Sequence, residues 1–94
     1  MKFQDLLAYK KSFDLAMQIF EVLKRFPKEE TYSLIDQIRR SSRSVTVNIS
    51  ESYRKRKYPK HFVSKLTYSD AENSEKQTWL EFSLACNYIN EELF

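Results

Sequence analysis

Hydrophobic residues recur along the chain at intervals of three and four, the spacing of one face of an α-helix. This pattern predicts three long helices, over residues 4–26, 33–57 and 59–89. Pro27 and Pro59 separate them, because proline ends a preceding helix and fits the first turn of a following one. Short connections make long helices antiparallel neighbours. We therefore predict an all-α, antiparallel up-down helical bundle that forms one domain over residues 1–94.

The middle segment has the most distinctive pattern of the three. On a helix its apolar residues share an arc of about 60°, with three serines on or beside it: Leu34, Ile38, Val45 and Ile49, with Ser41, Ser42 and Ser52. The opposite side is rich in arginine, with Arg39, Arg40, Arg43 and Arg54. This segment therefore offers a narrow apolar seam to neighbouring helices and a basic surface to another partner.

Polar residues fill the middle of the third segment, from Ser69 to Gln77. Polar groups inside a helical interface are costly unless they are hydrogen-bonded. We expect them to pair with Asn48 and the serines of the middle helix, or to contact water. For the helix starts, we expect Asp5 to cap the first helix and Thr31 or Ser33 the second.

The composition supports a helical fold. Glycine is absent, which argues against tight hairpins, P-loops and nucleotide-binding turns. One cysteine excludes an intrachain disulfide, provides no metal-ligand set and indicates a reducing cytoplasm. Apolar runs fall far short of the roughly 20 residues that span a bilayer. We predict a cytoplasmic protein with no cofactor, no metal and no membrane partner.

The sequence shows no nucleophile and base pair, so we predict that the protein is not an enzyme. His61 is expected to be a solvated first-turn residue, and Cys86 a buried small hydrophobe. Trp79 and the tyrosines have helical spacing and are interpreted as core or interface anchors. Glu51 and Glu75 lie on different helices, which favours ion pairs with neighbouring arginines over acid–base catalysis.

Charge is distributed unevenly along the chain. Residues 27–66 carry a net charge of +6, and residues 67–94 carry −5. One interpretation is binding of RNA or DNA phosphates by basic residues of the second helix and the turn after it: Arg39, Arg40, Arg43, Arg54, Lys55, Arg56, Lys57 and Lys60. The alternative is a protein–protein interaction module in which the arginines form intersubunit ion pairs and nucleic acid is not bound. The charge distribution alone supports these two interpretations almost equally.

The run from Phe26 to Tyr53, FPxExxYxLxxQIRRxxxSVxxNIxExY, resembles the signature of a bacterial four-helix-bundle family. Its members include proteins encoded in intervening sequences of 23S ribosomal RNA genes, and the accessory variability determinant of diversity-generating retroelements is a relative. The signature residues would be Gln37, Arg39, Arg40, Ser44, Asn48, Glu51 and Tyr53, with Glu75 on the third helix.

The resemblance implies an up-down-up-down bundle that assembles as a ring-like homo-oligomer, commonly a pentamer. It also implies a non-enzymatic binding or scaffolding role, because the retroelement relative presents a basic surface to nucleic acid and a protein partner. Ser52 stands where the family usually has glycine, so we expect the second helix to continue toward Lys57. Residues 90–94 resemble the start of a fourth helix, which we expect to be missing, leaving apolar surface exposed on the first and third helices.

Overall fold

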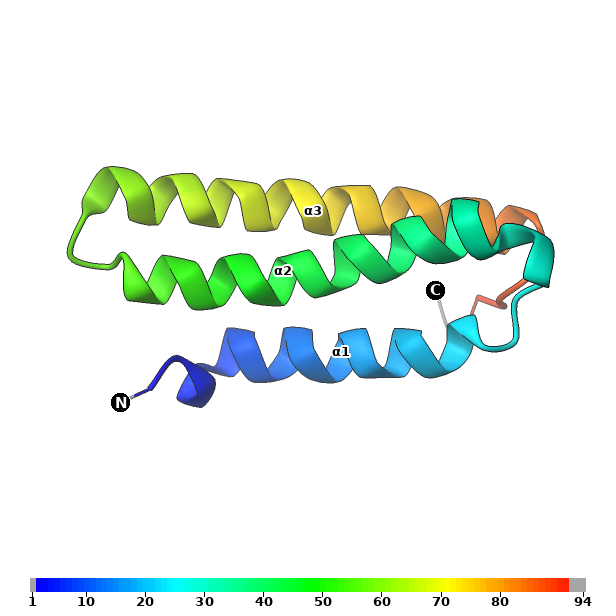
Figure 1. Cartoon of the computed structure of the whole chain (residues 1–94), viewed down its shortest axis with the longest axis horizontal. Coiled ribbons are helices and arrows are strands. Elements are labelled where there is room, and N and C mark those ends of the chain that lie inside the picture. The colour runs from blue at the N-terminus through cyan, green and yellow to red at the C-terminus, as the bar shows by residue number, and fades with distance from the viewer. Residues whose placement is uncertain (1, 92–94) are drawn as a thin grey trace.

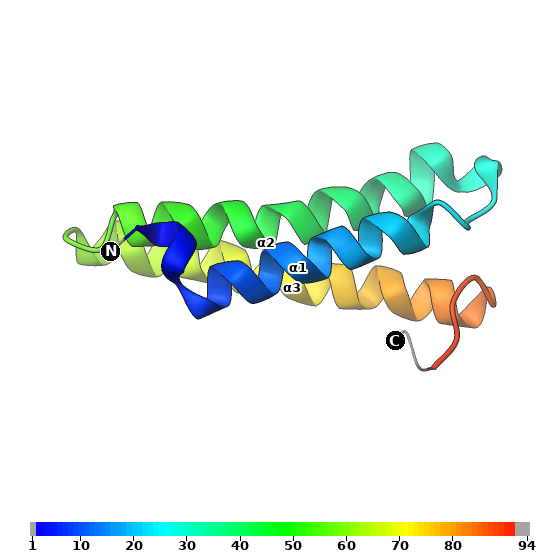
Figure 2. The same ribbon diagram turned by 90° about the horizontal axis from the view of Figure 1, so that it is seen from below.

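The computed structural model describes residues 2–91 and contains three long helices (Figure 1). They are α1 (Leu7–Leu23), α2 (Asp36–Arg54) and α3 (Pro59–Ala85). Successive helices run antiparallel, and α1 and α3 both pack against α2 while hardly contacting each other (Figures 1 and 2). The prediction of an all-α up-down bundle is confirmed, and each helix lies within its predicted segment.

The first helix begins later than predicted. Phe3–Asp5 forms a 3-10 turn, and the extended backbone of Leu6 (ψ 133°) separates it from α1. Asp5 is not the cap of α1, since its carboxylate accepts a hydrogen bond from the backbone N–H of Lys2 at 3.0 Å. At the other end α1 stops at Leu23, four residues before Pro27.

The entry into α2 also differs from the prediction. A 3-10 turn (Lys28–Glu30) leads into a π-helical turn (Thr31–Ile35) that runs directly into α2. The hydroxyls of Thr31 and Ser33 point back along the chain, to the carbonyl of Lys28 (2.6 Å) and the carboxylate of Glu30 (2.7 Å), so neither caps α2. At its far end α2 stops at Arg54, and residues 55–57 form a turn instead of the predicted continuation.

Asn87 ends α3 four residues earlier than predicted. Its φ of 63° is left-handed, the conformation that glycine usually adopts just after a helix. The chain contains no glycine, and asparagine tolerates this conformation better than most other residues. The N–H of Tyr88 then bonds to the carbonyl of Ser83, and that of Asn87 to Leu84. These two bonds define a Schellman motif. Asn90 and Glu91 are not helical, and the rest of the predicted fourth-helix start lies outside the described residues.

The large buried side chains gather at one end of the bundle. This core joins the end of α1, the start of α2 and the segment after α3, and consists of Ile19, Leu23, Phe26, Leu34, Ile38 and Ile89. Trp79 packs against it, and the ring of Tyr88 lies 5.2 Å from that of Phe26. The apolar core therefore lies beside the α1–α2 connection, at the opposite end of the bundle from the α2–α3 turn (Figure 1).

Small polar side chains fill the interface between α2 and α3. Ser41, Ser52 and Ser83 are buried, and each hydroxyl donates to a carbonyl of its own helix at 2.7–3.0 Å. Ser69 crosses to α2, where it bonds to the carbonyl of Val45 at 3.2 Å. Asn48 instead donates to Ser44 on its own helix, so its predicted pairing with α3 is wrong. The serine hydroxyls need few hydrogen-bond partners on the other helix, because backbone carbonyls of their own helix already accept their hydrogen bonds.

A groove separates α1 from α3. Leu15 and Leu66 face it and are 42% and 40% exposed, in agreement with the apolar surface expected on these two helices. Lys76 also lines the groove, with only 5% of its surface exposed and no hydrogen bond or ion pair to another of residues 2–91. Burial lowers the pKa of the Lys76 ammonium below its ordinary value of 10.5.

We predict that Lys76→Met stabilises the chain. An ammonium that is partly withdrawn from water without a partner loses only part of the roughly 1–3 kcal/mol that full burial of a polar group costs, so the free energy of unfolding at pH 7 should rise by up to about 1 kcal/mol. The cost is present while the folded lysine is charged and disappears as pH rises toward 10.5, where the unfolded chain also loses its proton. Urea unfolding at pH 7 and pH 11 tests this, with the exposed neighbour Gln77→Met as control. Equal stability of Lys76→Met and wild type at pH 7 would contradict the prediction.

Candidate nucleic-acid interface

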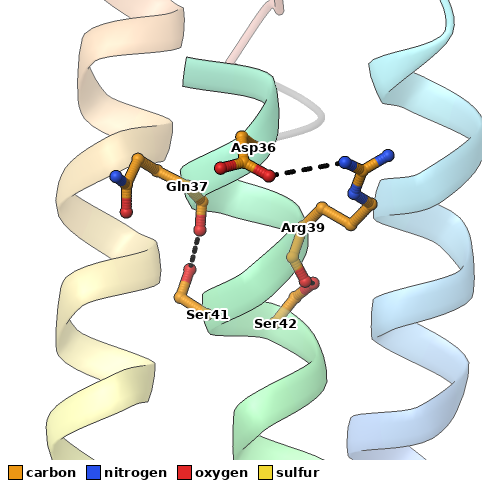
Figure 3. Close-up of polar contacts among 5 residues, drawn as sticks. All are labelled: Asp36, Gln37, Arg39, Ser41 and Ser42. Atoms are coloured by element: carbon orange, nitrogen blue, oxygen red, sulfur yellow. Dashed lines mark hydrogen bonds and ion pairs between the residues drawn. The ribbon is translucent and has the colours of Figure 1, made fainter. Parts of the chain in front are cut away.

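The arginines of α2 do not form one open face. Arg39 is half-buried and extends toward α1, where its guanidinium donates to the carboxylate of Asp36 at 3.4 Å (Figure 3). Arg43 is exposed but lies over the ring of Phe20 of α1, 5.8 Å from its centroid. Arg40 is exposed, with no such contact among the described residues. Two of the three mid-helix arginines are therefore held beside α1.

The remaining predicted phosphate ligands gather at the α2–α3 turn. We define the basic tip as Arg54–His61, in which every residue is exposed. Its five lysines and arginines lie within seven residues: Arg54, Lys55, Arg56, Lys57 and Lys60. The sequence has no acidic residue from Ser52 to Ser69. The tip therefore carries a concentrated positive charge that no nearby carboxylate of the sequence interrupts.

Aromatic rings order part of this tip. Arg56 lies 4.1 Å from the centroid of the Tyr53 ring and donates to the carbonyl of Tyr53 at 2.9 Å. Lys55 lies 6.0 Å from the ring of Tyr58, whose edge also meets His61. Tyr58 is 60% exposed, so of the two roles expected for the tyrosines, core or interface anchor, the core role is wrong for this one. Tyr53 and Arg56, and likewise Lys55 and Tyr58, are three residues apart, and in each pair the backbone N–H of the later residue bonds to the carbonyl of the earlier one, which brings the two side chains together.

Glu51, next to the tip, is paired across the bundle. Its carboxylate contacts the ammonium of Lys65 on α3 at 2.8 Å, instead of the arginine that the sequence suggested. This hydrogen bond and the charge of Lys65 hold the pKa of Glu51 below its ordinary value of 4.5. The pair ties the end of α2 to the start of α3 and removes the nearest acid from the basic tip.

The signature residues are distributed over the bundle and do not converge on one site. The side chain of Gln37 points toward α3, whereas that of Arg39 points toward α1 (Figure 3). Ser44 supplies the carbonyl that binds Asn48. Glu75, far along α3, accepts a hydrogen bond from the indole of Trp79 at 3.2 Å. These contacts shape the bundle, so the signature describes a fold more than a reaction centre.

The other candidate residues show no converging chemistry. His61 is exposed in the first turn of α3, as predicted, whereas Cys86 is exposed at the end of α3 and its predicted burial is wrong. Among residues 2–91, no three side chains of histidine, cysteine, aspartate or glutamate come together as metal ligands. None of the helices in this part of the chain is long and apolar enough to cross a membrane.

We predict that Glu51→Gln destabilises the chain only at pH values above the range in which the Glu51 carboxylate takes up its proton. The folded pKa is depressed, so the contribution of the pair is present at pH 7 and is lost as pH falls from 4.5 through the folded value. Because both side chains are partly exposed, the loss at pH 7 should be below about 1 kcal/mol. Urea unfolding at pH 7 and pH 2.5 measures it. A difference between wild type and variant that persisted unchanged at pH 2.5 would exclude the ion pair as its cause.

Comparison with known proteins gives a family for the chain. The model of a family described as 23S rRNA-intervening sequence protein matches residues 4–94, which include all three helices and the basic tip. No curated protein and no solved structure matches the chain.

Proposed function

The chain belongs to the family of 23S rRNA-intervening sequence proteins, and we propose that it is a non-enzymatic, oligomeric protein that binds RNA or DNA. The family description names no ligand, so the proposal depends on the surface of the molecule. The observation that carries the proposal is the basic tip, where five exposed cations lie within seven residues. The nearest acid, Glu51, is paired with Lys65.

Phosphate binding follows from the composition and exposure of the tip. Lysine and arginine that neutralise phosphates release condensed counterions, which drives binding to nucleic acid of any sequence. Arg54 adds donors arranged for bidentate phosphate contacts, and Arg56, whose Nη1 donates to the carbonyl of Tyr53, keeps its other N–H groups for a phosphate. Because the tip side chains are exposed, little desolvation opposes these contacts.

Tyr58 gives the tip a feature suited to unpaired bases. Tyr58 is 60% exposed at the turn, and the ammonium of Lys55 lies 6.0 Å from its ring. Exposed aromatic rings within a basic surface stack on bases of single strands, whatever the sequence. We therefore expect single-stranded nucleic acid to bind at least as well as duplex.

The mid-helix arginines are weaker candidates than the tip. Arg39 and Arg43 would have to leave Asp36 and Phe20 to reach a phosphate. Arg40 is free to do so, but it lies 14 residues from Arg54, about 21 Å along the helix. We assign the main contact to the tip and a second, minor one to Arg40.

A second candidate function is a protein–protein module in which arginines of α2 pair with acids of a neighbouring copy. The observation that favours it is the alternation of charges along the exposed side of α2, where Asp36 and Glu51 interrupt Arg40 and Arg54. The two functions are compatible, since Lys55, Arg56 and Lys57 lie beyond this alternation.

We predict that the triple variant K55Q/R56Q/K57Q loses nucleic-acid affinity. Fluorescence anisotropy with labelled single-stranded RNA, single-stranded DNA and duplex DNA, over a series of salt concentrations, measures the effect. Wild-type affinity should fall steeply with salt, whereas the variant should bind at least tenfold more weakly at low salt. The slope of log K against log salt should flatten by about 2 to 3, since each lost phosphate contact removes about 0.7–0.9.

The matched control is K10Q/R25Q/K28Q, which removes the same charge from exposed positions away from the tip. It should lower the affinity far less than the tip variant does. Equal losses in the two variants, or wild-type binding that is absent or independent of salt at low ionic strength, would refute binding by the tip.

A further inference from the structure

Two tyrosines accompany the cations of the basic tip, and they are not equivalent. Tyr53, at the end of α2, is half-buried, and the guanidinium of Arg56 lies over its ring, 4.1 Å from the centroid. The ring of Tyr58 is more open. The Lys55 ammonium lies 6.0 Å and the His61 ring 6.3 Å from its centroid, and the residue is 60% exposed. Arg56 therefore covers one ring, whereas the other is accessible to a ligand.

The backbone holds Tyr58 in place at the turn. Tyr58 precedes Pro59, the first residue of α3, and proline disfavours helical geometry at the residue before it. The backbone of Tyr58 is accordingly non-helical, with φ −122° and ψ 87°. Its N–H donates to the carbonyl of Lys55 at 2.8 Å, and its carbonyl accepts from the N–H of Phe62 at 2.9 Å. Only the two side-chain torsions of the tyrosine then have to be ordered when a flat ligand stacks on the ring.

Charge alone would lead the tip to favour duplex over single strands. Duplex DNA carries the higher density of phosphates and condensed counterions, so a group of cations gains more by binding it. An aromatic ring acts in the opposite direction, because the bases of a duplex are already stacked and paired, and taking one out of the stack costs free energy. A base of a single strand stacks on a side chain without this cost. The accessible ring of Tyr58 therefore gives the tip a means of preferring unpaired bases.

We infer that Tyr58 determines which nucleic acid the tip selects: an unpaired base stacks on its ring, while Lys55 and Lys60 contact phosphates of the same strand. The Lys55 ammonium, 6.0 Å from the ring centroid, is close enough to meet a phosphate next to the stacked base. The ligand is an unpaired nucleobase with its flanking phosphates, which RNA and DNA share. The inference rests on the proposed function, because it assumes that the tip binds nucleic acid, and it adds a preference for unpaired strands over duplex together with the residue that causes it.

Competition binding separates stacking from charge. Fluorescence anisotropy follows a labelled single-stranded RNA on the full chain while unlabelled competitors displace it at equal phosphate concentration. The competitors are single-stranded RNA, single-stranded DNA of the same sequence, a DNA strand of abasic sites, and relaxed circular duplex DNA, which has no strand ends. Wild type should prefer the two strands that carry bases over the abasic strand and the duplex by at least about fivefold, the contribution of one stacked base. The ratio between RNA and DNA strands distinguishes the two sources of this ligand.

Tyr58→Leu removes the ring without changing the charge of the tip. It should lower the affinity for strands with bases at least about fivefold, keep the affinity for the abasic strand and the duplex within about twofold, and leave the salt slope unchanged. Tyr58→Phe keeps the ring and should bind as wild type does. The matched control is Tyr32→Leu, which removes a 95% exposed tyrosine from the π-helical turn at the opposite end of the bundle and should not alter binding.

Equal affinity of wild type for the abasic strand and the strands with bases, or wild-type binding by Tyr58→Leu, would overturn the inference. An equally large loss of Tyr58→Leu on the abasic strand would also overturn it, since that loss cannot come from stacking. If K55Q/R56Q/K57Q loses affinity and Tyr58→Leu does not, the tip binds phosphates and only the role of Tyr58 is refuted. Wild-type protein that binds none of these nucleic acids would refute the proposed function, and the inference with it.

Discussion

The close packing of α2 against α3 depends on serine hydroxyls that bond to their own helix. Ser41, Ser52 and Ser83 are buried, yet each donates to a carbonyl one turn earlier. Burial of these hydroxyls therefore leaves no donor unpaired, and their small size lets the two helices approach. Since serines occupy much of this interface, the large apolar side chains are concentrated at one end, around Ile38 and Phe26.

This unequal distribution explains why the basic tip can form at the other end. The α2–α3 turn lies far from the large apolar core, and its side chains are held by local contacts such as those of Arg56 with Tyr53. Cations at the end of α2 also face the negative end of the helix dipole, which favours them there. One end of the bundle thus supplies stability, and the opposite end is free to carry charge for a ligand.

The sequence predicted features that depend on one helix and missed those that depend on its neighbours. The buried arc predicted for the second helix follows from periodicity alone and is confirmed for Leu34 in the π-helical turn and for Ile38 and Val45 in α2, whereas Ile49 is only half-buried. The direction of Arg39 could not be predicted in this way, because it depends on where α1 lies. The end of α3 was missed for another reason. Asn87 adopts the left-handed conformation that usually falls to glycine after a helix, and the spacing of hydrophobic residues does not show which asparagine will do so.

The position of the basic tip has a consequence for an oligomer of this protein. The tip lies at one end of a bundle whose longest extent is 44 Å, and its five cations are exposed. In the oligomer that we propose, each copy contributes one tip, and once one tip holds a strand the contact of the next tip becomes intramolecular. A tip with a few cations gains useful affinity in this way without any further phosphate ligand on the face of the bundle.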